Sequence, residues 1–135
     1  MSRVVVSGLQ VALSSSKADV VTDANFTIGS GEIVGLVGES GSGKTTVATA
    51  MLGHTRKGAE IVKGSVTIDG VDILSLSAGA LRSARGRVIS YVPQDPAAAL
   101  DPCMTIGRHL REAVKAHESI AGIDWDARLA ELLRD

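Results

Sequence analysis

The chain has 135 residues and a formal net charge of -1, and 44% of its residues are hydrophobic but only 2% aromatic. This length allows one modest domain, whose core must rest on Val, Leu, Ile and Ala. The charge balance argues against a nucleic-acid-binding protein, which usually carries a basic surplus. A single cysteine excludes an internal disulfide framework and fits a reducing compartment. The apolar runs are far shorter than the roughly 20 residues that span a bilayer, so work at a membrane would require a partner.

The first third of the chain is typical of strands that lead into a loop and a helix. Residues 4–13 are rich in β-branched side chains, and residues 20–28 alternate loosely, so both segments predict strands. Residues 33–37 form a short continuous apolar run, which is typical of a strand buried on both faces of a parallel sheet. Residues 45–52 carry apolar side chains at helical spacing and predict a helix.

The middle of the chain contains a hairpin pattern. Residues 65–68 and 71–73 flank Asp69-Gly70, which is a strong indication of a tight two-residue turn. Residues 54–63 are polar and are expected to be a connection between the preceding helix and this hairpin.

Later elements are indicated by caps and by apolar runs. Ser77, Thr105 and Asp124 are each expected to cap a helix, because a side-chain oxygen at that position accepts from the first helical N–H groups. Residues 87–92 predict another buried strand. Residues 93–96 contain two prolines and are expected to be a loop.

A glycine-rich loop between the apolar run and the helix indicates a phosphate-binding site. Backbone N–H groups can hold phosphates only where no bulky side chain intervenes, and glycines permit that wrapping. We expect Lys44 to reach the β- and γ-phosphates, Thr45 to ligate Mg²⁺ and Thr46 to donate to the α-phosphate. The residues expected to bind the nucleotide, most simply ATP with Mg²⁺, are Gly38, Glu39, Ser40, Gly41, Ser42, Gly43, Lys44, Thr45 and Thr46.

Kinases, GTPases, helicases and transport ATPases all use such a loop, so further motifs must discriminate among them. Residues 91–96 (Tyr-Val-Pro-Gln-Asp-Pro) resemble the glutamine loop of ATP-binding-cassette (ABC) ATPases, and residues 64–73 resemble the antiparallel hairpin of those proteins. Residues 81–86 and 94–107 resemble the ATPase subunits of dipeptide, oligopeptide and nickel importers.

This resemblance implies an α/β fold. It would be a P-loop NTPase core with an antiparallel β subdomain and the start of a helical subdomain, forming part of an ABC ATPase domain. Residues 1–93 would form the nucleotide-binding core with the antiparallel subdomain. Residues 94–135 would contain the glutamine loop and the start of the helical subdomain.

The resemblance also implies roles and partners. Gln94 would approach Mg²⁺ and the attacking water through its side-chain amide, and Lys44 would act with it in catalysis. Thr45 and Gln94 would be the metal ligands. The partners would be ATP, transmembrane permease subunits and a second ATPase subunit in a head-to-tail dimer, with no nucleic acid. The protein would lie in the cytoplasm on the inner face of the cell membrane.

The sequence departs from the family pattern in two respects. No aromatic residue precedes Phe26, and Leu13 stands near the position where the family stacks an aromatic residue on adenine. The Leu-Ser-Gly-Gly-Gln signature, the acidic strand end and the switch histidine are also absent, and His54, His109 and His117 are expected to be ordinary surface or helix residues. The sequence therefore resembles the N-terminal half of the family domain, and little ATP hydrolysis is expected.

Four functional hypotheses remain open at this point. The leading one is an energy-coupling ATPase subunit of an importer for peptides or related small solutes. The second is a non-hydrolysing nucleotide-binding or regulatory module. The third is a small-molecule P-loop kinase, but this sequence has no identifiable basic lid segment. The fourth is an ABC protein of DNA repair or translation, but this sequence has neither a basic surplus nor zinc-type cysteine pairs.

Overall fold

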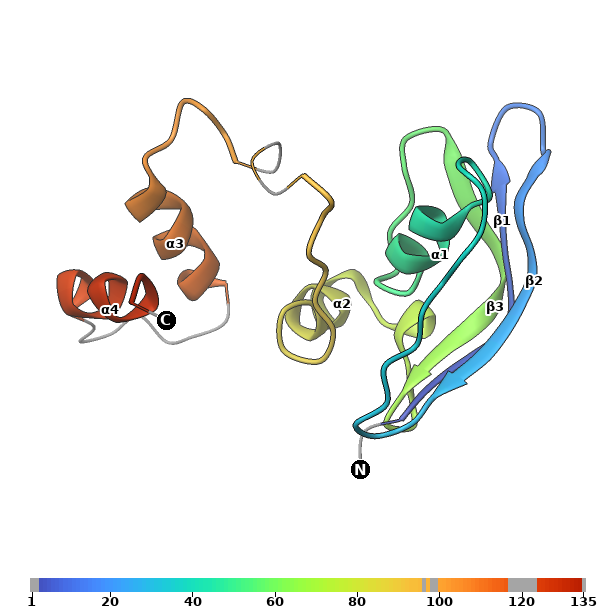
Figure 1. The fold of residues 1–135 in the computed structure, drawn as a ribbon, viewed down its shortest axis with the longest axis horizontal. Coiled ribbons are helices and arrows are strands. Elements are labelled where there is room, and N and C mark those ends of the chain that lie inside the picture. Colours follow the sequence, from blue (N-terminus) through green and yellow to red (C-terminus); the bar gives the residue numbers. More distant parts are fainter. Residues whose placement is uncertain (1–2, 96, 98–99, 117–123, 135) are drawn as a thin grey trace. The chain divides into compact units, whose positions relative to one another are not determined.

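The chain is divided into two compact units, residues 1–91 and residues 92–135. The computed structural model describes residues 3–95, 97, 100–116 and 124–134. The first unit contains a β-sheet with a helix against it, and the second contains two helices (Figure 1). Each unit is described separately below.

A four-stranded antiparallel sheet with the order β2-β1-β3-β4 is the framework of the first unit. Its strands are β1 (Val4–Leu13), β2 (Asp19–Ile28), β3 (Ala59–Ile68) and β4 (Val71–Asp72). Both strands expected at the start of the chain are confirmed. The predicted tight turn is confirmed as well, because Asp69 and Gly70 have φ values of 51° and 84° between β3 and β4, as a type I′ turn requires.

Strands β1 and β3 approach each other unusually closely at Gly64. The register of β1 shifts between Val6 and Leu9 on its β2 side and between Ser7 and Gln10 on its β3 side. Gly64 has a φ of +103°, and a Cβ at that position would lie 2.5 Å from the Leu9 Cα atom. The irregularity therefore brings two backbones together where only glycine fits.

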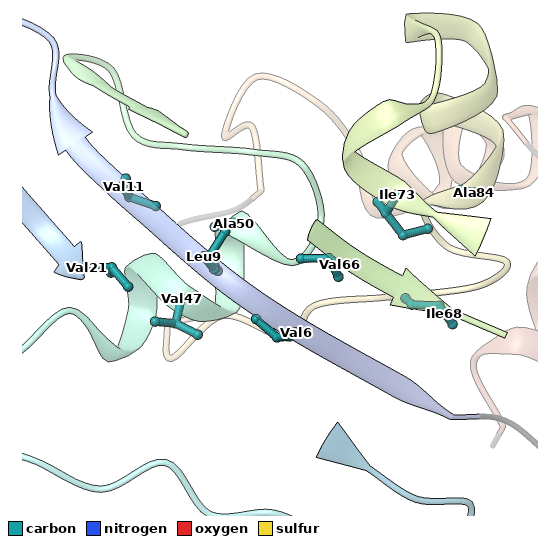
Figure 2. Packing of buried hydrophobic residues seen from close by; sticks show 10 residues of the cluster. All are labelled: Val6, Leu9, Val11, Val21, Val47, Ala50, Val66, Ile68, Ile73 and Ala84. Carbon is teal, nitrogen blue, oxygen red and sulfur yellow. The ribbon is translucent and has the colours of Figure 1, made fainter. Parts of the chain in front are cut away.

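Aliphatic side chains build the core of the first unit between the sheet and its short helices. Helix α1 (Lys44–Ala50) contributes Val47 and Ala50, which lie beside residues of β1 in Figure 2. The helices η1 (Ile73–Ser75) and α2 (Ala78–Ala84) contribute Ile73 and Ala84. The prediction of a Val, Leu, Ile and Ala core is confirmed, since the buried cluster comprises Val6, Leu9, Val11, Val21, Val47, Ala50, Val66, Ile68, Ile73 and Ala84.

Two predicted strands are wrong. Residues 33–37 have no regular secondary structure and pair with no strand in the described part of the chain, and Ile33 is 98% exposed. Within residues 87–92, only Ile89 takes part in β pairing, through an isolated bridge to Arg85. Val92 is 80% exposed. An apolar run becomes a strand only where a neighbour accepts its backbone hydrogen bonds. The sheet in the described residues is entirely antiparallel and offers these two runs no parallel neighbour.

Exposure of residues 33–37 leads to a stability prediction. We expect Ile33→Lys to change the unfolding free energy by less than ~0.5 kcal/mol, because the side chain makes little packing contact. The same substitution should reduce self-association, since exposed apolar runs promote it. Urea denaturation and light scattering measure the two effects. A loss above ~1 kcal/mol would mean that this run is buried in solution.

The second unit contains α3 (Ile106–Lys115) and α4 (Trp125–Leu132). The predicted caps are confirmed: Thr105 accepts from the Arg108 N–H and Asp124 from the N–H groups of residues 126 and 127. Ser77 caps α2 in the first unit in the same way. The guanidinium carbon of Arg111 lies 6.0 Å from the ring centre of Trp125, which joins α3 to α4. His117 lies outside the described residues. No described helix is both long and apolar enough to cross a membrane.

Candidate nucleotide-binding site

The glycine-rich loop leads into α1 through Gly43, which is the N-cap of that helix and has a φ of 88°. Its α carbon faces the neighbouring strand so closely that a Cβ would lie 2.9 Å from the Val20 carbonyl oxygen. The loop therefore packs directly on β2. Only a residue without a side chain allows this left-handed turn against the strand.

Backbone donors at the start of α1 lack acceptors within the helix. The first helical hydrogen bond runs from the Val47 N–H to the Gly43 carbonyl oxygen, at 2.9 Å. The N–H groups of residues 44–46 precede it, and Gly43 supplies no side-chain cap. These donors suit an anionic ligand, for the reason that makes phosphate-binding loops glycine-rich.

Contacts to α2 hold the far end of α1. Arg85, which follows α2, donates from Nε to the Leu52 carbonyl oxygen at 2.9 Å and from Nη2 to the Gly53 carbonyl oxygen at 3.0 Å. Gly53 ends the helical turn with a φ of 64°, and a Cβ at that position would lie 3.1 Å from the Leu81 side chain of α2. The helix that carries the loop is therefore fixed to the sheet by its apolar face, and the turn after it is held by Arg85 at the end of α2.

The ammonium of Lys44 folds back over the loop. Its Nζ atom donates to the carbonyl oxygens of Gly38 at 2.9 Å and Glu39 at 2.6 Å, and it lies 3.4 Å from the Ser42 hydroxyl. The Ser42 N–H closes the loop by donating to the Glu39 carbonyl oxygen at 3.2 Å. The cation is thus held over the loop by groups that a phosphate oxygen can replace as acceptor.

A cavity of about 280 Å³ lies over the loop and the first turn of α1. It brings together five of the expected residues and two that the sequence did not suggest. Those two are Val20 and Arg56, which come from β2 and from the connection before β3. The lining consists of Val20, Gly41, Gly43, Lys44, Thr45, Thr46 and Arg56.

The oxygen chemistry of this cavity suits Mg²⁺ delivered with a nucleotide. Thr45 places a hydroxyl in the lining, and Mg²⁺ takes one or two protein oxygens together with phosphate oxygens and water. The described residues contain no cluster of three or more His, Cys, Asp or Glu side chains that would hold a metal independently. The Thr45 hydroxyl fits a metal whose other ligands are phosphate oxygens and water.

The other expected site residues lie outside this cavity. The exposed loop contains four of them, Gly38, Glu39, Ser40 and Ser42. Gln94 is exposed and belongs to the second unit, so its approach to the metal stays a prediction. Leu13 is 40% exposed at the end of β1, where it pairs with Ala59 of β3. The cavity lining contains no aromatic residue.

A larger cavity of about 430 Å³ lies between β2, residues 33–37 and α1. Its lining is Ala24, Asn25, Phe26, Ile28, Val34, Leu36, Val47, Ala48 and Met51. Asn25 is the one polar side chain in that set, so this cavity offers no charge complement for phosphates. Volume alone favours it as a site, but the chemistry favours the smaller cavity.

Comparison with known proteins identifies the family. The model of the ABC transporter family matches residues 21–134. A putative peptide import ATP-binding protein of Brucella abortus is 40% identical over 116 residues, which cover 85% of this chain and 35% of the relative. The oligopeptide transport ATP-binding protein OppD of Salmonella typhimurium is 39% identical over 118 residues, covering 86% of this chain and 35% of the relative.

A metal-staphylopine import system ATP-binding protein, CntD of Staphylococcus aureus, is 32% identical over 133 residues, covering 98% of this chain and 49% of the relative. A solved ATP-binding subunit of an ABC transporter superposes with a TM-score of 0.68 at 27% identity, covering 97% of this chain and 49% of that structure. The chain thus spans between a third and a half of the length of these relatives. The predicted fold, part of an ABC ATPase domain, is confirmed, and the chain belongs to the ABC transporter family.

Proposed function

We propose that the chain binds ATP with Mg²⁺ through residues 38–46, as the N-terminal part of an ATPase subunit that energises an importer of peptides or related small solutes. The observation that carries the proposal is the cavity in which Lys44, Thr45 and Thr46 meet the glycine backbone. The names of the peptide and oligopeptide import relatives support the transport role. Permease subunits and a second ATPase subunit are the partners that this role requires.

Binding would exchange one set of hydrogen bonds for another. The Lys44 ammonium would leave the Gly38 and Glu39 carbonyl oxygens and donate to the β- and γ-phosphates. The N–H groups of residues 44–46 would donate to phosphate oxygens. Mg²⁺ bound with ATP would neutralise charge on the β- and γ-phosphates. Thr45 would hold that metal through its hydroxyl, and the Thr46 hydroxyl would donate to the α-phosphate.

Hydrolysis would require a positioned water molecule in addition to these contacts with the phosphates and Mg²⁺. Gln94 is the residue proposed for that role, because an amide oxygen can accept from water and ligate a metal without adding charge. Catalysis of phosphoryl transfer is largely positioning and charge stabilisation. A Gln94→Ala variant should therefore lose turnover wherever turnover is measurable, and its ATP affinity in Mg²⁺ should fall by no more than the roughly tenfold expected for the loss of one metal ligand. The second candidate function is a non-hydrolysing nucleotide-binding module. ATP turnover by the unmodified chain that is lost in Lys44→Ala would reject this candidate.

Titration calorimetry of the chain with ATP tests both the proposal and the role of Thr45. The chain should bind one ATP in Mg²⁺ and bind it more weakly in EDTA. Thr45→Ala should weaken binding about tenfold in Mg²⁺ and have little effect in EDTA, because it removes one metal ligand. Thr45→Ser keeps the hydroxyl and should restore the magnesium effect. Absence of binding by the unmodified chain would reject the proposed function, and equal binding by Thr45→Ala in Mg²⁺ would reject the metal role.

A further inference from the structure

Arg56 lines the same cavity as the phosphate loop, although it lies outside the loop motif and outside α1. It follows Lys44 by twelve residues, in the connection that returns the chain to β3. Its side chain is exposed, and the described part of the chain gives the guanidinium no carboxylate or carbonyl partner. A planar cation at the wall of a nucleotide cavity is a group that a ligand can use.

The backbone that carries Arg56 is held in place by three hydrogen bonds. The Ala59 N–H donates to the Arg56 carbonyl oxygen at 3.0 Å, and the Thr55 hydroxyl donates to the Ala59 carbonyl oxygen at 2.8 Å. The Ser14 N–H donates to the Gly58 carbonyl oxygen at 2.9 Å and so ties this connection to the turn between β1 and β2. The backbone at Arg56 is therefore fixed beside the ends of β1 and β3, so nucleotide binding has to order only the Arg56 side chain.

The composition of the cavity indicates which part of a nucleotide Arg56 would contact. The loop already supplies the Lys44 ammonium and the N–H groups of residues 44–46 for the phosphates. Beyond the loop and the two threonines, the lining is Val20 and Arg56. An aliphatic residue and a guanidinium plane both suit the face of a base, and no aromatic side chain in the lining competes for that face.

Resting on the proposed ATP binding, we propose that Arg56 is a base-contacting residue, whose guanidinium stacks on the adenine ring of the bound nucleotide. The stack supplies the base contact within the cavity that Arg56 and Val20 both line. Arg56 thereby contributes to affinity for the nucleoside part of the ligand and not to affinity for its polyphosphate.

Two ligands separate a base contact from a phosphate contact. Titration calorimetry in Mg²⁺ compares ATP with inorganic tripolyphosphate, which has the phosphate chain but no base. Arg56→Ala should weaken ATP binding about fivefold and leave tripolyphosphate binding within about twofold. Arg56→Lys keeps the charge but loses the plane, so it should behave like Arg56→Ala. Arg56→Tyr replaces one planar group with another and should restore ATP affinity.

Lys57→Ala is the matched control, because Lys57 is the adjacent exposed cation and lies outside the cavity lining. It should bind both ligands like the unmodified chain. Unchanged ATP binding by Arg56→Ala would overturn the inference, and so would an equal loss for ATP and tripolyphosphate, which indicates a phosphate contact. If Lys44→Ala lowers neither affinity, the proposed function fails, and that outcome is distinct from a failure of Arg56 alone.

Discussion

Lys44→Ala should weaken binding of ATP in Mg²⁺ by about 10- to 100-fold, which is the largest effect on nucleotide affinity expected from one substitution in this chain. A hydrogen bond to a charged group contributes about 1.5–3 kcal/mol, and 1.4 kcal/mol corresponds to a factor of ten in affinity. Lys44 is the cation that the loop itself supplies to the cavity. Its loss removes both the charge and the donors at the β- and γ-phosphates.

Part of this effect comes from the ligand-free loop. The Lys44 ammonium bridges the Gly38 and Glu39 carbonyl oxygens, so its removal also loosens the loop before binding. Lys44→Arg keeps a positive charge and a side chain long enough to approach these carbonyl oxygens. However, its planar guanidinium is wider than the compact ammonium of lysine and cannot occupy the same position. It should recover only part of the affinity. Titration calorimetry measures both variants, with Lys57→Ala as the control for loss of one positive charge. Equal affinity of Lys44→Ala and the unmodified chain would reject the phosphate-loop assignment.

Local chemistry explains why much of the fold was predictable. A helix cap needs one side-chain oxygen and the next few N–H groups, and Ser77, Thr105 and Asp124 all form the expected caps. The turn at Asp69-Gly70 needs two residues that tolerate positive φ, and both adopt it. Each of these features is set within about four residues, so a short stretch of sequence contains all the relevant information.

Pairing between distant segments explains the errors. Residues 33–37 have the composition of a buried strand, but whether they form one depends on neighbours far away in the chain. At β3, distant pairing has the opposite effect and makes a strand where the sequence predicted none. That strand begins at Ala59, inside the polar connection expected over residues 54–63, because the ten residues of β1 supply pairing partners as far as Leu13.

Arg56 illustrates the same limit at the candidate site. The loop motif specifies residues 38–46, and these are contiguous, so the sequence identifies them directly. Arg56 joins them only because β3 returns antiparallel to β1 and brings the connection to the cavity. No short motif around Arg56 encodes that return, so Arg56 is found only from the lining of the folded cavity.

Gly64→Ala should lower the unfolding free energy by about 3 kcal/mol or more. A Cβ there would lie 2.5 Å from the Leu9 Cα and 2.7 Å from the Gly8 carbonyl carbon and oxygen. These are backbone atoms and cannot rotate away, so β1 and β3 would have to separate. Overpacking of this kind costs about 1–3 kcal/mol, and a non-glycine residue in strained backbone costs about 1–3 kcal/mol more. Leu9 is fully buried, so the separation would also disturb the core.

Gly70→Ala provides the matched comparison, because it isolates backbone strain from collision. Gly70 has a φ of +84°, and a Cβ there would meet nothing within 4 Å. Its substitution should therefore cost only about 1–2 kcal/mol, the penalty for left-handed backbone. Urea denaturation followed by circular dichroism gives both values. Equal losses would mean that β1 and β3 do not approach closely at Gly64 in solution, and that the irregularity in their register leaves room for a side chain. A larger loss of unfolding free energy for Gly64→Ala would show that the sheet on which the phosphate loop packs requires the close approach of β1 and β3.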